Sequence, residues 1–434
     1  MPVNQVHAVP HLTTALSGPL QEIEEHLLKH QTHIEQWFRG QWQTTRAPFY
    51  ASVDLRNAGF KLAPVDTNLF PAGFNNLNPA FLPLCIQAVQ FAAEHYCQHA
   101  SNVVLIPERH TRNQFYLESV ASLVNILELA GFNVRVGSLS EDQDSPELLE
   151  LPSGRTLRRE PLSRDGNQLR IGDFKPCFVL LNNDLSAGRP AILEGLEQPV
   201  IPPLNMGWSN RLKSDHFAHY RRVVAEFAKL VDIDPWLMDP IFRRCGKIDY
   251  MKREGEECLV RNVTEVLDAV QAKYNEYGID QRPFVFVKSD SGTYGMNVMV
   301  VHSIDEVAAL NRKQRSKMAR GKEGADITDV IVQEGVYTFE TWGNDQAVAE
   351  PVVYMIDRFV VGGFYRVHAD RGVHDNLNAP GMHFEPLAFA ESGATCYRSK
   401  TPSASPNRFY AYGVVARLAL LSAAHELANS DGIS

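Results

Sequence analysis

The sequence predicts an α/β protein in two parts, a domain with a parallel sheet over residues 1–204 and a domain of α+β subdomains over residues 205–434. The parallel sheet is predicted because two short apolar runs, 102–106 and 132–136, flank an amphipathic helix that ends at a glycine. Such a βαβ unit places its strands parallel to each other. The second domain is predicted from residues 283–301, which have the pattern of a strand, a glycine-containing loop and a second strand.

Composition and charge exclude several classes of protein. The 434 residues carry a net charge of −9, from 42 basic and 51 acidic side chains, which argues against a general nucleic-acid binder because phosphate contacts need a basic face. No apolar run approaches the ~20 residues of a membrane helix, and the N-terminus lacks the pattern of a signal peptide. The six cysteines are scattered without a C-x-x-C pair, which is typical of reduced thiols in a cytoplasmic protein. We therefore expect small-molecule partners, no nucleic acid and no membrane, while a homo-oligomer stays open.

The N-terminal part begins with a predicted helix over residues 16–40, followed by a strand over residues 50–53. Residues 52–77 then mix charged and amide side chains with phenylalanines, which is typical of an ordered loop that lines a site. A small zwitterionic substrate needs this mixture, with cations for its carboxylate and carboxylates or amides for its ammonium group. The alternative is a structural Ω-loop whose Asn and Asp side chains cap its own turns. The candidate substrate-binding residues of this stretch are Arg56, Lys61, Asp66, Asn68, Asn75 and Asn76.

Polar residues also follow the strands of the predicted parallel sheet. Glu108 and Arg109 come just after the first of these strands, and residues 182–186 follow the apolar strand 177–181. Open α/β sheets bind their ligands beyond the carboxyl ends of the strands, so these residues are expected near a site. A surface ion pair between Glu108 and Arg109 is the competing interpretation.

The hairpin over residues 283–301 has the features of a phosphate-binding loop. Lys288 ends its first strand, and Gly292 and Gly295 allow the backbone to approach a ligand closely. Loop N–H groups can then converge on phosphate oxygens beside the charge of the lysine. A P-loop is excluded because there is no Gly-x-x-x-x-Gly-Lys-Ser/Thr, and a plain hairpin with a glycine turn is the alternative. The residues of this hairpin predicted to bind a phosphate-bearing cofactor are Lys288, Ser289, Ser291, Gly292, Thr293, Tyr294 and Gly295.

The second half of the chain adds a helix before the hairpin and several strands after it. The helix is predicted to end near Val231, with Ser209 or Ser214 as its N-cap. The elements predicted after the hairpin are strands over residues 330–336, 347–356 and 359–367, a polar loop over residues 370–381 and a closing helix over residues 409–427. Glu350 and Arg366 therefore fall on successive strands.

This order of elements resembles the ATP-grasp ligases over about residues 205–427. In that fold two α+β subdomains hold ATP between them, and the adenine lies against a connecting strand. The resemblance implies that Lys288 and its loop cover the phosphates of the nucleotide. It also implies that the adenine is read by the end of the strand 330–336, namely by Gln333, Glu334, Gly335 and Val336.

A closer resemblance covers nearly the whole chain. The runs 57–77, 208–217 and 287–296 resemble the proteobacterial glutamate–cysteine ligase family, whose ATP-grasp-like fold is similar to that of glutathione synthetase. The resemblance implies a pre-ATP-grasp-type N-terminal domain. It also implies ATP-dependent joining of the γ-carboxylate of glutamate to the amine of cysteine, the first step of glutathione synthesis. Two alternatives stay open, a ligase for another amino-acid pair and a nucleotide-binding regulatory protein without turnover. Release of ADP only when glutamate and cysteine are both present would separate the three.

The implied chemistry assigns roles to the later residues. A carboxylate is a poor acyl donor, so ATP first converts it to an acyl phosphate, a step that needs charge neutralisation more than proton transfer. Lys288 and Arg366 are the predicted catalytic cations, and Mg²⁺ is predicted to bind oxygen ligands from Glu350, Asn376 and Asn378. The two asparagines also fall in a loop that resembles the glycine-bearing loop over the acceptor site of glutathione synthetases, so they are predicted to contact substrate. The alternative for Glu350 is an ion pair with Arg366, and the Glu-x-Asn pair of many ATP-grasp enzymes is absent after Arg366.

Overall fold

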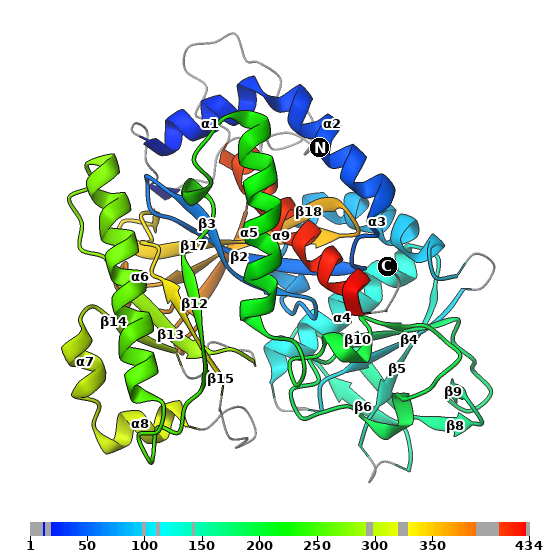
Figure 1. Cartoon of the computed structure of the whole chain (residues 1–434). Coiled ribbons are helices and arrows are strands. Elements are labelled where there is room, and N and C mark those ends of the chain that lie inside the picture. The colour runs from blue at the N-terminus through cyan, green and yellow to red at the C-terminus, as the bar shows by residue number, and fades with distance from the viewer. Residues whose placement is uncertain are drawn as a thin grey trace.

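A computed structural model describes residues 12–13, 19–97, 101–109, 113–140, 144–291, 298–319, 329–387 and 408–430. The described strands form sheets of seven, six and four strands and a two-stranded ribbon, with helices packed against them (Figure 1). The predicted mixed α/β class is confirmed.

The seven-stranded sheet joins the two ends of the chain. Its longest strands are β17 (Ala347–Ile356) and β18 (Phe359–His368), and β17 also pairs with β2 (Tyr50–Asn57), which pairs in turn with β3 (Leu62–Asn68). All these pairings are antiparallel. The shorter strands of the sheet are β1 (Leu12–Thr13), β16 (Thr341–Trp342) and β19 (His383–Pro386). Strands from both sides of residue 204 share this sheet, so that boundary does not separate two independent sheets. The division into two domains stays a prediction.

Helices α5 (Lys213–Val231) and α9 (Arg408–Ser430) cross this sheet in Figure 1. Residues 411–424 of α9 are apolar almost all round the helix, the pattern of a helix that is buried on every side. In agreement, Leu418, Leu420 and Leu421 are fully buried, and the helix contacts β2, β3, β17 and α5. Each buried leucine contributes about 2 kcal/mol of hydrophobic free energy, so α9 anchors the sheet from one face. Two further helices, α1 (Pro19–Lys29) and α2 (Gln31–Thr44), replace the single helix predicted over residues 16–40.

The six-stranded sheet contains the predicted βαβ unit. Strand β4 (Asn102–Pro107) runs parallel to β5 (Asn133–Ser138), and α4 (Gln114–Leu129) connects them, as the sequence predicts. On its other side β4 pairs in parallel with β10 (Phe178–Asn182). The remaining elements of this region are α3 (Leu82–Glu94), β6 (Glu147–Glu150), β7 (Thr156–Pro161), β11 (Val200–Ile201) and the ribbon β8 (Ser163–Asp165) with β9 (Gln168–Arg170).

The four-stranded sheet carries the predicted hairpin. Strands β13 (Val285–Ser289) and β14 (Val298–Val301) are antiparallel, and β13 pairs on its other side with β15 (Asp329–Glu334). Strand β12 (Phe242–Lys247) completes the sheet beside β15. Its helices are α6 (Glu256–Tyr277), α7 (Ile304–Ala308) and α8 (Arg312–Met318). The tip of the hairpin, residues 292–297, lies outside the described residues.

Two local predictions are wrong. Residues 52–68 are not a loop but the greater part of the β2–β3 hairpin, followed by short 3₁₀ turns over Phe74–Asn76 and Pro79–Phe81. Many of the polar side chains that suggested a loop belong to β2 and β3, and the strand on the other side of β2, β17, lies some three hundred residues further along the chain. The N-cap of α5 is Leu212, so neither Ser209 nor Ser214 caps that helix with its own side chain.

The expectation that all cysteines are reduced is also wrong. Cys97, after α3, and Cys177, before β10, form a disulfide with their Cα atoms 6.0 Å apart. They are separated by 80 residues, so spacing along the sequence gives no sign of the pairing. Cys85, Cys245 and Cys258 are free thiols. No helix among the described residues combines the length and apolar character needed to cross a membrane.

Candidate active site

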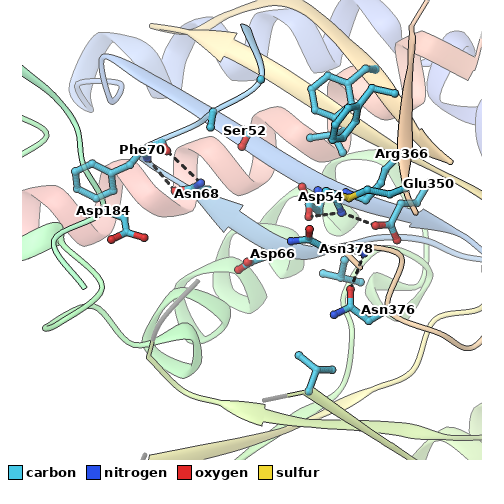
Figure 2. Close-up of a pocket in the computed structure, with 18 of the residues that line it drawn as sticks. Ser52, Asp54, Asp66, Asn68, Phe70, Asp184, Glu350, Arg366, Asn376 and Asn378 are labelled. Carbon is cyan, nitrogen blue, oxygen red and sulfur yellow. Dashed lines mark hydrogen bonds and ion pairs between the residues drawn. The ribbon is translucent and has the colours of Figure 1, made fainter. Parts of the chain in front are cut away.

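A cavity of about 300 Å³ lies where the three sheets meet. Its first wall is the face of the seven-stranded sheet formed by β2, β3, β17 and β18, and its second wall comes from β13, β14 and β15. The third wall is the carboxyl end of the parallel strands β4 and β10, where Glu108 and Asp184 lie, as expected for ligands of open sheets. Figure 2 shows Asp184 on one side of the cavity and Arg366 with Glu350 on the other.

A network of buried charges occupies the end of the cavity formed by β2, β17 and β18. Arg366 Nη1 donates to Asp54 Oδ2 at 2.9 Å and to Glu350 Oε1, as the dashed lines of Figure 2 mark. Arg56 Nε donates to the other oxygen of Glu350 at 3.2 Å, and its remaining nitrogens donate to the carbonyls of Val336 and Asp375. The strand register explains why Glu350 and Arg366 are in contact, because the two residues lie directly opposite each other on β17 and β18.

The pKa shifts in this network follow from burial and from the charges themselves. Burial raises the pKa of the Asp54 carboxyl, and the Arg366 guanidinium opposes that rise. Burial also works against charge on Arg366, but the carboxylates of Asp54 and Glu350 outweigh it and hold the pKa of Arg366 above its ordinary value. The arginine therefore stays charged, and removing one member would leave a buried charge without compensation, at a cost of about 3–5 kcal/mol.

Two lysines lie at the end of the cavity formed by β13 and the start of α5. Lys288 Nζ donates to the carbonyl of Val65 at 2.8 Å, and Lys213 Nζ donates to Asp66 Oδ1 at 2.8 Å. Burial, together with the nearby charges of Lys213 and Arg56, lowers the pKa of Lys288 to about 7, against the opposing effect of Asp66. Burial raises the pKa of Asp66, but Lys213 and Lys288 outweigh it and lower the value to about 2. The result is a corner in which two ammonium groups lie beside the carboxylate of Asp66.

The end of β15 presents its two polar side chains to opposite faces. Gln333 lines the cavity and is 1% exposed, and its Nε2 has no hydrogen-bond partner among the described residues. Glu334 points the other way, where Lys61 Nζ donates to it at 2.8 Å and Trp236 Nε1 at 3.2 Å. Gly335 is required by packing, because a Cβ at that position would lie 2.2 Å from the ring of Phe284.

The structure brings most of the predicted site residues to this one cavity. The predicted residues that line it are Arg56, Asp66, Asn68, Asn75, Asn76, Lys288, Ser289, Ser291, Gln333, Glu350, Arg366, Asn376 and Asn378. Of the nucleotide-binding prediction, Gly292, Thr293, Tyr294 and Gly295 lie outside the described residues. Gly335 and Val336 adjoin the cavity without contributing to its lining.

Two predicted site residues face away from the cavity. Lys61 is fully buried, and its ammonium group is held by Glu334 and by the carbonyl of Asp239 at 3.0 Å. Lys61 is therefore withdrawn as a substrate-binding residue, and the carboxylate of Glu334 as a reader of the adenine. For Glu334 alternation explains the difference, because successive side chains on a strand point to opposite faces and the sequence does not say which face is lined. Lys61 lies in the turn between β2 and β3, and the sequence does not show that its ammonium group is directed to Glu334.

Sequence reasoning missed Asp54 and Lys213. Asp54 alternates with Ser52 and Arg56 along β2, and all three line the cavity. Reading this stretch as a strand with a period of two would have found Asp54. Lys213 lies in one of the runs that carry the family resemblance, but nothing in the sequence separates it from other lysines at the start of a helix.

The described residues hold no preformed cluster of three or more His, Cys, Asp or Glu that could bind a metal. The three predicted metal ligands line the cavity. They are Glu350, whose carboxylate is paired with two arginines, and the amides of Asn376 and Asn378. Asn376 Oδ1 accepts the backbone N–H of Asn378 at 3.0 Å, which fixes the loop beside the charge network (Figure 2). In the structure Glu350 is ion-paired with Arg366, as the alternative interpretation of this residue predicts, and it is also paired with Arg56.

Comparison with known proteins agrees with these features. The model of the glutamate-cysteine ligase family matches residues 24–427. A crystal structure from Methylobacillus flagellatus, provisionally described as a gamma-glutamylcysteine synthetase, is 59% identical with a TM-score of 0.88, covering 98% of this chain and 99% of that chain.

Two other solved structures are more distant. A glutathione synthetase-like effector of Globodera pallida is 10% identical with a TM-score of 0.37, covering 85% of this chain and 81% of that chain. D-alanyl-alanine synthetase A of Vibrio cholerae is 12% identical with a TM-score of 0.31, covering 74% of this chain and 81% of that chain. These scores are too low to carry an argument about the fold. No curated protein matches the chain.

The mixed α/β fold and a cavity lined with paired charges agree with an enzyme that acts on small charged molecules, and the comparisons define the class as a ligase. The chain belongs to the glutamate-cysteine ligase family. Its reaction joins glutamate to cysteine, the first step of glutathione biosynthesis. The family resemblance in the sequence is thereby confirmed, and the two alternative functions are set aside.

Proposed function

We propose that this ligation takes place in the cavity between the three sheets, that it uses ATP and Mg²⁺, and that the fold is of the ATP-grasp type. The observation that carries the proposal is that Lys288 and Arg366, which belong to different sheets, line the same cavity. A ligase of this kind needs a phosphate-binding cation and a carboxylate-binding cation within one substrate's reach of each other.

The corner formed by Lys288, Lys213 and Gln333 fits a nucleotide. Two ammonium groups suit a triphosphate. Among the described residues, Lys288 donates to the carbonyl of Val65 alone, and Lys213 has one ion pair, with Asp66. Gln333 keeps a buried donor without a partner among the described residues, which costs about 1–3 kcal/mol unless a ligand accepts from it. We propose that a ring nitrogen of the base or a phosphate oxygen is that acceptor.

The opposite end fits an amino acid. Arg366 has a buried Nε without a partner among the described residues, so its guanidinium can still donate to a substrate carboxylate. The amides of Asn68, Asn75 and Asn76 line the cavity and offer acceptors for an ammonium group. Asp66, another predicted substrate contact that lines the cavity with them, is ion-paired with Lys213 beside Lys288. Arg366 would then hold the reacting carboxylate and spread its developing charge, while the buried walls of the cavity exclude water.

When bound, ATP supplies the phosphoryl group that turns the γ-carboxylate of glutamate into an acyl phosphate, from which the amine of cysteine displaces phosphate. Magnesium in such sites is held by one or two protein oxygens together with the phosphates and several waters, so a preformed protein cluster is not required. Glu350, Asn376 and Asn378 are the proposed oxygen donors. Glu350 would exchange one of its two arginine partners for the metal.

The test is ADP release by the purified protein with Mg²⁺. We expect release only with glutamate and cysteine together, and a loss of at least about a hundredfold for Lys288→Ala. The matched control is Lys273→Ala on α6, because Lys273 is ion-paired with Asp234 at 2.7 Å and does not line the cavity. Equal activities of the two variants would remove the cavity from the mechanism.

A further inference from the structure

The strand that carries Lys288 is tied to the helix that carries Lys213 by a buried carboxylate. Asp290 follows β13 directly and is fully buried. Its Oδ1 accepts the backbone N–H of Ser214 at 2.7 Å, and its Oδ2 accepts the hydroxyl of Ser214 at 2.6 Å. Its carbonyl accepts the N–H of Lys213 at 2.7 Å. Three hydrogen bonds thus join two consecutive residues of α5 to one residue of the hairpin.

This contact replaces a helix cap. The N-cap residue of α5 is Leu212, whose side chain cannot accept a hydrogen bond, so the first turn has N–H groups without a local partner. Asp290, which follows a strand of the four-stranded sheet, supplies the missing acceptor. Its negative charge suits the N-terminal end of the helix dipole. Moving the helix start and the hairpin apart would therefore break three hydrogen bonds and leave N–H groups of the first turn unpaired, and the buried carboxylate of Asp290 would keep, among the described residues, only Arg244, at 3.6 Å.

The tie controls where the two lysines meet. Lys288 is two residues before Asp290, and Lys213 is one residue before Ser214, so both side chains leave from the joined segment. They end on neighbouring residues of β3, Lys288 on the carbonyl of Val65 and Lys213 on the carboxylate of Asp66. A shift between β13 and α5 would change the spacing of the two ammonium groups in the cavity.

We propose that Ser214 and Asp290 are positioning residues that set the spacing of Lys288 and Lys213 for the phosphates of ATP. This inference rests on the proposed function, because it presumes that the two lysines bind the nucleotide. It adds a determinant of nucleotide affinity that makes no contact with the amino-acid end of the cavity. A defect in it should therefore weaken the enzyme toward ATP and leave its affinity for glutamate unchanged.

The experiment compares Ser214→Ala, Ser214→Thr and Asp290→Asn in the full-length enzyme. We expect Ser214→Ala to raise the KM for ATP about tenfold, because a hydrogen bond to a charged group is lost, with the KM for glutamate within twofold of the starting value. Ser214→Thr restores the hydroxyl and should restore the KM for ATP. Asp290→Asn loses an accepting oxygen and should show the larger effect.

Ser422→Ala is the matched control. Ser422 is fully buried, and its hydroxyl donates to the carbonyl of Leu418 within α9 at 2.7 Å, so its loss removes a buried hydroxyl away from the cavity. The inference is overturned if Ser214→Ala behaves like Ser422→Ala, or if the KM values for ATP and glutamate rise together. If Asp290→Asn does not fold, the serine variants still decide.

A failure of the positioning role can be distinguished from a failure of the proposed function. Normal activity of Lys288→Ala would contradict the proposed function itself. An inactive Lys288→Ala together with an unaltered Ser214→Ala would contradict only the positioning role.

Discussion

The two ends of the cavity hold their cations in different ways. At the end proposed for the amino acid, Arg366 and Arg56 share the carboxylates of Asp54 and Glu350 in a closed network on antiparallel strands. At the end proposed for the nucleotide, Lys288 donates to a neutral carbonyl, and Gln333 Nε2 has no hydrogen-bond partner among the described residues. The first end is organised before any ligand arrives, whereas the second has groups whose present partners a ligand can replace without breaking a buried ion pair.

Arg366→Ala should have the largest effect and should damage both folding and catalysis. We expect turnover to fall about a thousandfold or more, because the cation beside the reacting carboxylate is lost. We expect the free energy of unfolding to fall by about 3–5 kcal/mol, because Asp54 loses its arginine and Glu350 keeps only Arg56. Steady-state kinetics and denaturant unfolding measure the two effects. The control is Arg417→Ala, which breaks a pair with Glu35 outside the cavity; an unchanged stability for Arg366→Ala would show that its network is not preorganised.

Lys288→Ala should lower activity without lowering stability. Its activity should be lost, as above, but its free energy of unfolding should change by about 1 kcal/mol or less, since the one hydrogen bond given up among the described residues is that to the carbonyl of Val65. Thermal unfolding of this variant beside Arg366→Ala tests the contrast between the two ends. A destabilisation as large as that of Arg366→Ala would contradict it.

The pH dependence should report the lysine directly. Because the pKa of Lys288 is lowered to about 7, kcat/KM for ATP should decline as the pH rises through about 7, where the free enzyme loses this charge. The pKa of an unfolded lysine is about 10.4, so the unfolded state binds more protons between these values and the contribution of Lys288 to stability rises over the same range. In Lys288→Arg the cation does not titrate, and the decline should disappear. A decline that persists in Lys288→Arg would assign it to another group.

Gln333→Leu should have a smaller effect, confined to the nucleotide. We expect the KM for ATP to rise about tenfold through loss of one donor, with the free energy of unfolding unchanged or slightly higher, because a buried unpartnered group is removed. Nucleotide titration and thermal unfolding measure these. Loss of stability would mean that the amide has a structural partner.

Lys61→Met should leave catalysis almost unchanged. Lys61 is paired with Glu334 behind the cavity wall, so its loss should lower the free energy of unfolding by about 3 kcal/mol or more while the KM for glutamate stays the same. A raised KM for glutamate without a change in the free energy of unfolding would show that Lys61 contacts the substrate.

The sequence was informative where a local pattern determines structure. The βαβ unit, the hairpin that carries Lys288 and the paired strands with Glu350 and Arg366 all follow from periodicity and turn residues, and the structure contains them. The family was recognisable because three runs of residues are distinctive even without a structure. The predicted roles of the individual site residues stay predictions.

What the sequence could not provide depends on contacts between distant segments. The sequence predicts a loop over residues 52–68 because polar side chains on a strand that faces a cavity resemble those of a loop. The strand character of these residues depends on the pairing of β2 with β3 and with the distant β17. The direction of Glu334 depends on which face of β15 meets the cavity, and the direction of Lys61, in the turn between β2 and β3, depends on its contact with Glu334. The role of Asp290 as a cap for α5 depends on a contact across 76 residues.

The irregular pairing of β2 with β3 has a consequence for how this enzyme tolerates change. Asp54 pairs with Asp66 and Leu55 with Pro64, so Val65 is an extra residue that bulges from the ladder. A chain lacking Val65 would keep every one of these pairs in an uninterrupted ladder. Yet it would give up the carbonyl on which Lys288 rests, together with the local bend of the strand. A single-residue deletion that makes the sheet more regular should therefore make the catalyst worse.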